Sequence, residues 1–97
     1  MRRDVDCKIV IFSSHAVQQM FFRRISREDV KAVIAYGEII EEMPDDEPFP
    51  SYLILDFVGG QPVHVVLSHD VTRQTCYVVT AYVPNLGLWN DDFRTRR

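Results

Sequence analysis

The chain has 97 residues, of which 46% are hydrophobic and 26% charged, and its formal net charge is −3. A chain of this length supports one hydrophobic core, so we predict a single domain over residues 1–97. Its composition is too apolar for a disordered protein, and no apolar run is long enough to span a bilayer. The N-terminal MRRDVDCKIVIF has a short apolar run and no small-residue cleavage site of a signal peptide, so we expect a cytoplasmic protein without a membrane segment. The negative charge argues against wholesale binding of a phosphate backbone.

The cysteines and histidines do not have the spacing of a metal site. Cys7 and Cys76 are too few and too far apart for a zinc ribbon or a C-x-x-C motif, so we predict reduced thiols, with one disulfide as the alternative. His64 and His69 lie five residues apart on a predicted strand and should point to opposite faces of the sheet. We expect neither a metal nor a cofactor.

The first third of the chain predicts one short strand and two helices. CKIVIF has the composition of a strand, and Ser13 or Ser14 can cap the helix that follows. The apolar stripe of that helix is expected to consist of Ala16, Val17, Met20 and Phe21.

The second helix has the clearest start signal in the sequence. Ser26 and Asp29 have the spacing of a capping box, and Ile25 and Val30 have that of a hydrophobic staple. Its buried face is expected to be formed by Val30, Val33 and Ile34. Gly37 suits the left-handed position that ends a helix.

After Gly37 the pattern changes to strands. EIIEEM, SYLILDFV, PVHVVLS and TCYVVTAYV are each bounded by proline, glycine or polar turns, which predicts an antiparallel meander. GGQ between the second and third of these runs predicts a hairpin turn. LILDFV is too apolar for an edge strand. PNLGLWNDDFRTRR is expected to close with a short helix that begins at Asn90 and brings Trp89 and Phe93 onto the core.

The charged residues are unevenly distributed. Arginines gather before residue 28 and after residue 93, and acidic residues gather in EEMPDDEPFP. This distribution predicts a basic side and an acidic side of the domain. The acidic run lacks the spacing of a calcium loop and is interpreted as a solvated turn stiffened by proline.

A helical wheel places Gln18, Gln19 and Phe22 within roughly 60° of His15, and Arg23 within about 80°. His15 and Arg23 are then about 12 Å apart along the helix axis, a distance that suits neighbouring phosphates of one strand. Phe22 between them is an aromatic residue on the polar face and can stack on a base. The alternatives are structural: capping or surface exposure for the histidine, and completion of the helix end for the arginine.

The polar residues of the last two strands form a second candidate cluster. The partner of His64 depends on the hairpin loop that follows it: a five-residue loop pairs His64 with Tyr82, and a four-residue loop pairs it with Ala81. This register decides whether His64, Thr80 and Tyr82 form one polar cluster or lie separately on a half-exposed sheet.

In their order and spacing, several segments resemble the bacterial domain of unknown function 4258, from about residue 12 to residue 97. They are SSHAVQQM with RRISREDV, YGEIIEEMPDDEPFPSYLIL, PVHVVLSHD, YVVTAYVP and LWNDDFRTRR. That family is similar to the RelE-like and BrnT-like ribonuclease toxins, and genes of its members often lie beside small antitoxin genes, including ones that encode zinc-ribbon antitoxins. The resemblance implies an α+β fold of RelE-like or barnase-like architecture, with two N-terminal helices packed on a four- to five-stranded curved antiparallel sheet.

The resemblance also implies site residues. It points to His15 at the start of the first helix, Arg23 at its end, and the polar residues of YVVTAY, which are Thr80 and Tyr82. Family members often have a basic residue where this chain has Gln19 and a glycine where it has Arg24. The first difference removes positive charge from the expected site, and the second adds it.

Our first hypothesis is a metal-independent endoribonuclease toxin that cleaves messenger RNA. In it the RNA 2′-hydroxyl attacks the adjacent phosphorus, His15 or His64 moves the proton, and Tyr82 positions the scissile group. The expected RNA contacts are Phe22, Arg23, Arg24 and Arg94. The rival is a non-catalytic protein-binding module, or a degenerate toxin fold retained as an interaction surface. The expected partners are RNA, an antitoxin protein or a second copy that pairs through an open strand edge.

Overall fold

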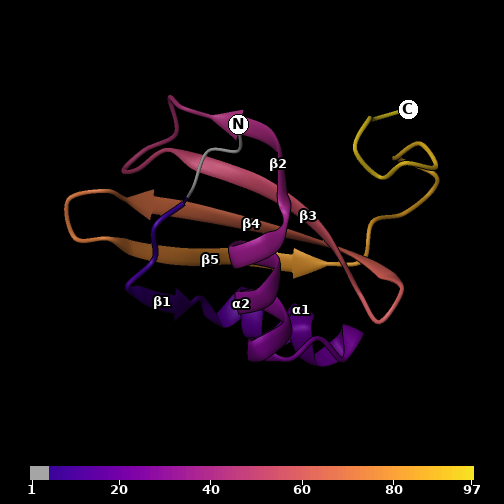
Figure 1. Ribbon diagram of the computed structural model, residues 1–97, viewed down its shortest axis with the longest axis horizontal. Coiled ribbons are helices and arrows are strands. Elements are labelled where there is room, and N and C mark those ends of the chain that lie inside the picture. The colour runs from indigo at the N-terminus through magenta and orange to yellow at the C-terminus, as the bar shows by residue number, and fades with distance from the viewer. Residues whose placement is uncertain (1–4) are drawn as a thin grey trace.

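The computed structural model describes residues 5–97, in which one strand is followed by two helices and then by four strands. Figure 1 shows the strands as one twisted sheet, with α1 beside β5 and α2 in front of the sheet, where it packs against β3 and β4. In chain order the elements are β1 (Ile9–Phe12), α1 (Ser14–Arg23), α2 (Arg27–Tyr36), β2 (Glu38–Met43), β3 (Ser51–Val58), β4 (Gln61–Asp70) and β5 (Thr75–Tyr82). Neither helix has the length and apolar character that crossing a bilayer requires.

The strand order is β1-β5-β4-β3-β2, and β2 to β5 form the predicted antiparallel meander. The sheet as a whole is mixed, because β1 pairs in parallel with β5. The α+β prediction is therefore confirmed, with one parallel pair added. β3 is an interior strand, as its apolar sequence indicates. Gly59 and Gly60 form the β3–β4 turn with φ of 58° and 83°, which a glycine adopts without a Cβ clash.

The main hydrophobic core lies between α2 and one face of the sheet, which we call the helix face. Val63, Val65 and Leu67 of β4 point to it and are at most 1% exposed. The expected buried stripe of α2 is confirmed, since Val30, Val33 and Ile34 are all buried. The capping box at its start is also present, because Ser26 Oγ accepts from the Asp29 amide and Asp29 Oδ2 accepts from the Ser26 amide.

The apolar stripe of α1 is narrower than its sequence predicts. Ser13 is the N-cap, and its amide and hydroxyl donate to the carbonyls of Val78 and Val79, which fixes the start of α1 beside β5. Ala16 and Met20 are buried, but Phe21 is 82% exposed. The prediction that Phe21 belongs to the packed stripe was wrong. α1 lies along β5, and only the narrow stripe of Ala16 and Met20 packs against the core.

Gly37 does not have the left-handed conformation that we predicted, since its φ is −74° and its ψ 174°. It is needed for another reason. A Cβ at this position would lie 2.5 Å from the Val33 carbonyl oxygen and 2.7 Å from Ile54 Cγ2. Glycine therefore allows the end of α2 to approach β3 closely, a requirement of packing rather than of backbone angle.

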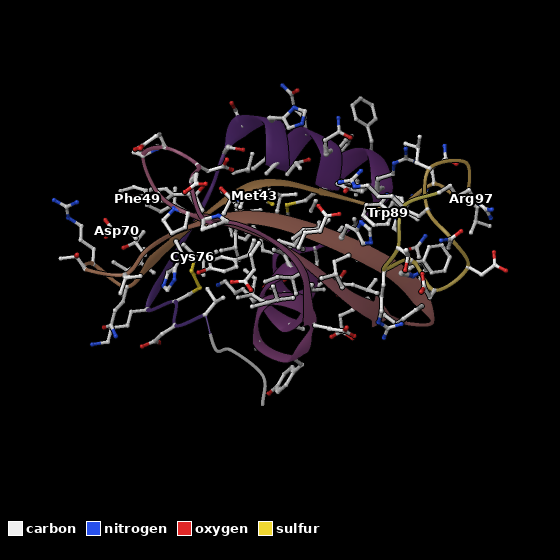
Figure 2. The ribbon with its side chains drawn as sticks, turned by 90° about the horizontal axis from the view of Figure 1, so that it is seen from above. Met43, Phe49, Asp70, Cys76, Trp89 and Arg97 are labelled. Atoms are coloured by element: carbon white, nitrogen blue, oxygen red, sulfur yellow. A yellow bond between two sulfur atoms is a disulfide. The ribbon has the colours of Figure 1, made fainter. Side chains whose placement is uncertain are left out.

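Cys7 and Cys76 form a disulfide, so the prediction of two reduced thiols was wrong. Their Cα atoms are 5.5 Å apart although 69 residues separate them in sequence. The contact arises because β1 returns to pair with β5, with Val10 opposite Cys76. Sequence spacing alone does not reveal this parallel pairing. The yellow sulfur bond is visible beside the Cys76 label in Figure 2.

Candidate functional site

The face of the sheet opposite α2, which we call the site face, carries both polar and apolar residues of the strands. Strand pairing arranges them in rows, of which the first is Glu38, Leu55, His64 and Tyr82 and the second is Glu41, Leu53, Val66 and Thr80. Figure 2 shows α2 below the strands and Trp89 above them, on the site face. α1 rises on that same side in Figure 2 and lies at the β5 edge in Figure 1, so it borders this face.

His64 pairs with Tyr82, but the loop is not the one we associated with that register. Asp70 pairs with Thr75, which leaves a four-residue loop, and this loop alone would place His64 opposite Ala81. A β-bulge near Val79 shifts the register by one residue. Thr80 lies on the same face in the next row, opposite Val66, so it neighbours the pair without a side-chain hydrogen bond to it.

The side chain of His64 is completely buried. Its Nδ1 lies 3.2 Å from the Tyr82 hydroxyl, and its Nε2 lies 2.7 Å from the Phe93 carbonyl oxygen. The Trp89 ring packs edge-on against the imidazole, with centroids 4.5 Å apart. His64 therefore contacts one side chain of the sheet and two residues of the C-terminal segment, residues 84–97.

These contacts determine which ring nitrogen carries a proton. A carbonyl oxygen can only accept, so Nε2 of His64 must be the donor to Phe93. Burial lowers the pKa of His64, and the bond to Phe93 and the charge of Glu41 oppose this effect only in part. The neutral ring then has a free lone pair on Nδ1, to which the Tyr82 hydroxyl donates.

Tyr82 is half-buried and connects His64 to the solvent-facing part of the site face. Burial raises the pKa of its hydroxyl, the positive charge of Arg96 lowers it, and Glu41 raises it. Tyr82 is therefore neutral at pH 7. A neutral hydroxyl that donates to an imidazole can accept a proton from another molecule while it passes its own to the ring. The pair has the chemistry of a proton relay.

The C-terminal segment forms turns and no helix, so the prediction of a short helix at Asn90 was wrong. The strand bridge between Trp89 and Arg96, with Asn90 N donating to the Thr95 carbonyl at 2.8 Å, folds the segment back on itself. Trp89 is 2% exposed, as its expected return to the sheet requires. It covers His64 on the site face, whereas the main core lies on the other side.

The arginines of this segment lie against acidic residues of β2. Arg94 Nε binds Glu38 at 2.7 Å, and Arg96 Nε binds Glu41 at 2.9 Å. Basic and acidic side chains therefore lie together where the C-terminal segment meets β2, and the predicted separation of a basic side from an acidic side is wrong there. Arg94, which we expected to contact RNA, is already paired. Arg96 also lies over the Trp89 ring, 4.5 Å from its centroid.

The site residues expected on α1 are exposed. Among residues 5–97 no ion pair involves Arg23 or Arg24, and no hydrogen bond joins His15 or Arg23 to His64 or Tyr82. Phe22 is 75% exposed, and its ring lies edge-on to Phe21. The structure thus places two candidate groups on the molecule, a buried pair on the sheet and exposed side chains on the bordering helix.

Arg24 has a structural role that its charge does not reveal. It is the C-cap of α1 in the left-handed region, with φ 56° and ψ 40°. Glycine has no Cβ penalty in this conformation. The glycine expected at this position in related chains is explained by backbone geometry, so its replacement here is not evidence for an added phosphate contact.

Some contacts of the site were not predicted from the sequence. The Phe93 contribution is a main-chain carbonyl, for which residue type gives no signal. Arg96 and Glu41 stand 55 residues apart and meet only because the segment folds back over β2. Trp89 was expected on the core, and only its place beside His64 is new. No three His, Cys, Asp or Glu side chains within residues 5–97 form a group that could hold a metal ion.

The fold and the site define a small α+β domain with a buried histidine–tyrosine pair under an aromatic cover. The chain belongs to the family DUF4258, a domain of unknown function, whose family model matches residues 12–83. The match ends before the segment that supplies Trp89, Phe93 and Arg96. No curated protein matches the chain significantly, and no solved structure does so.

Proposed function

We propose that the protein is a metal-independent endoribonuclease toxin of a toxin–antitoxin pair, which cleaves messenger RNA. The observation that carries the proposal is the hydrogen bond from Tyr82 to Nδ1 of His64, with Nε2 of the same ring bound to the Phe93 carbonyl. Such a pair can remove a proton from a hydroxyl at neutral pH. The 2′-hydroxyl is the group that RNA offers and DNA lacks.

In the proposed reaction Tyr82 takes the proton of the 2′-hydroxyl and passes its own proton to Nδ1 of His64. The 2′-oxygen forms a bond to the adjacent phosphorus, and the bond from phosphorus to the 5′-oxygen breaks. His15, exposed on α1, gives a proton to the leaving 5′-oxygen. The products are a 2′,3′-cyclic phosphate and a 5′-hydroxyl end.

Charge stabilisation is assigned to α1. Arg23 lies at the end of this helix, on the side of the molecule that borders the site face, and has no ion pair within residues 5–97. It is therefore available to a phosphate that develops negative charge during the reaction. Phe22 offers an exposed ring on which a base can stack.

The test is cleavage of a single-stranded RNA by the purified protein in the presence of EDTA, with analysis of the product ends. We expect cyclic phosphate ends, and a loss of about 10²–10⁴-fold in rate for Tyr82→Phe, the range typical of general acid–base groups. Tyr36→Phe is the matched control, because Tyr36 is 79% exposed on α2. Equal rates for wild type and Tyr82→Phe, or no cleavage by the wild type, would refute the mechanism.

Arg23→Ala tests the phosphate assignment, with Lys31→Ala on α2 as the control for loss of one positive charge. Arg23→Ala should lower cleavage and relieve growth inhibition on induced expression without a change in the circular dichroism spectrum. Unchanged cleavage by this variant would remove Arg23 from the mechanism.

A second candidate, a non-catalytic protein-binding module, is favoured by one observation. Phe21 and Phe22 are 82% and 75% exposed at the end of α1, where they can anchor an apolar partner such as an antitoxin. Normal growth on induced expression, together with tight binding of the protein encoded beside this gene and weaker binding by Phe21→Ser, would support this candidate.

A further inference from the structure

We propose that the C-terminal segment, residues 84–97, is an integral part of the site, in which Phe93 and Trp89 are positioning residues that fix the orientation and the protonated nitrogen of His64. Only the catalytic consequence of this inference rests on the proposed function. The effect on the imidazole itself is measurable without any RNA.

The Phe93 carbonyl selects the tautomer. Without an acceptor at Nε2, the proton of a neutral imidazole can occupy either nitrogen, and a proton on Nδ1 would block acceptance from Tyr82. The carbonyl lies 2.7 Å from Nε2 and so favours the form with the proton on that atom. The Phe93 ring packs against Phe57 of β3, with centroids 6.3 Å apart, which holds the carbonyl in place.

Trp89 selects the orientation. Its ring is nearly perpendicular to the imidazole, at 87°, and the two side chains are 2% and 0% exposed. The indole therefore covers the ring, keeps water away from both nitrogens and prevents rotation about the Cβ–Cγ bond. An imidazole left uncovered at this position could turn and exchange its partners with water.

Ion pairs to β2 hold the segment on the sheet. Arg94 and Arg96 bind Glu38 and Glu41, and Arg96 also stacks on Trp89. A turn within the segment is stabilised by Asp92, whose Oδ1 accepts from the amides of Arg94 and Thr95 at 2.9 and 3.1 Å. These exposed charges are screened by salt, so each pair alone contributes little, and the packed indole is the main anchor.

The groups that face His64 come from three elements. Tyr82 on β5 donates to the ring, and the charges of Glu41 on β2 and Arg96 in the segment act on it from a distance. The family model ends at residue 83, before the segment begins. The stretch that matches the family model thus contains His64 and Tyr82 but not the two residues that position the ring in this chain.

The experiment records long-range proton–nitrogen NMR spectra of the full-length protein with labelled histidine, over a pH titration. In the wild type we expect a neutral His64 at pH 7 with its proton on Nε2. Trp89→Ala should give a mixture of tautomers and a titration midpoint closer to 6.5, the ordinary histidine pKa. Trp89→Phe should restore the wild-type tautomer, and Leu88→Ala, at a residue 64% exposed, should leave it unchanged.

A second variant keeps the inference testable should Trp89→Ala fail to fold. Arg96→Gln removes the cation over the Trp89 ring without opening a cavity, and a fraction of Nδ1-protonated His64 should appear. The tautomer is the readout for this variant, because loss of the Arg96 charge by itself raises the pKa of His64. A single Nε2-protonated form with an unchanged midpoint in a folded Trp89→Ala protein would overturn the inference. Without a folded Trp89→Ala protein, a single Nε2-protonated form of His64 in Arg96→Gln would overturn it.

Cleavage assays of the same variants separate this inference from the proposed function. If both hold, Trp89→Ala should lower cleavage by about 10–100-fold, the scale of a misplaced catalytic group, and Leu88→Ala should not. If the spectra change as expected and no protein cleaves RNA, the positioning role stands and the ribonuclease proposal fails.

Discussion

The two faces of the sheet are built from alternate residues of the same strands, yet they are stabilised in different ways. On the helix face, Val63, Val65 and Leu67 of β4 pack into a continuous apolar core under α2. On the site face, the neighbouring His64 is buried by individual contacts to Tyr82, Phe93 and Trp89. The difference shows that the valines and the leucine of β4 are stabilised by a shared apolar core, whereas His64 depends on individual partners. Substitutions should therefore have different effects on the two faces.

The largest expected effect concerns the disulfide, because Cys76 belongs to the helix-face core. A cross-link over 69 residues restricts the unfolded chain, and such links typically contribute about 2–4 kcal/mol to the free energy of unfolding. Reduction should lower the urea midpoint by the corresponding amount. Cys7→Ala is the control and should be insensitive to reductant. An unchanged wild-type midpoint after reduction would show that the core does not depend on the link.

Two adjacent valines of β4 allow a direct comparison of the two faces. Val65 is fully buried on the helix face, and Val66 is half-buried on the site face. We expect Val65→Ala to lower the free energy of unfolding by about 2–3 kcal/mol and Val66→Ala by less than about 1 kcal/mol, because only the first leaves a closed cavity. Urea denaturation measures both. Equal losses would contradict the contrast between the faces.

A smaller effect, of opposite sign, is expected at the end of α1. Arg24 has a φ of 56°, which costs a residue with a Cβ about 1 kcal/mol. Arg24→Gly should therefore raise the free energy of unfolding by about 1 kcal/mol. Arg24→Ala, which keeps the Cβ, should show no such gain. A gain by both variants would point to charge rather than to backbone strain.

The most specific effect is a pH dependence that belongs to the site face. Burial lowers the pKa of folded His64 below 6.5, its value in an unfolded chain. The unfolded state then binds more protons between these two pKa values, so this contribution is fully present above about 6.5 and is lost as the pH falls toward the folded pKa. His64→Gln should remove this part of the pH profile. A profile unchanged by the substitution would show that His64 stays uncharged for another reason.

The sequence determined the secondary structure well where one local signal decided it. The capping box at Ser26 and Asp29, the glycine turn at 59–60 and the alternation of the strands each require only neighbouring residues. The candidate pair was also within reach of the sequence, since His64 and Tyr82 were both predicted. Their pairing was left open, because a bulge changes the register without any composition signal that we could read.

Several features were decided only by the tertiary structure, because they involve contacts between segments far apart in the chain. The Cys7–Cys76 disulfide depends on the parallel pairing of β1 with β5. The exposure of Phe21 depends on the position of α1 against the sheet. Glycine is needed at position 37 because β3 approaches the end of α2 closely. The protonated nitrogen of His64 depends on the main-chain carbonyl of Phe93. Local propensities and periodicity act over a few residues, whereas these features arise from packing between distant segments and from backbone atoms that every residue shares.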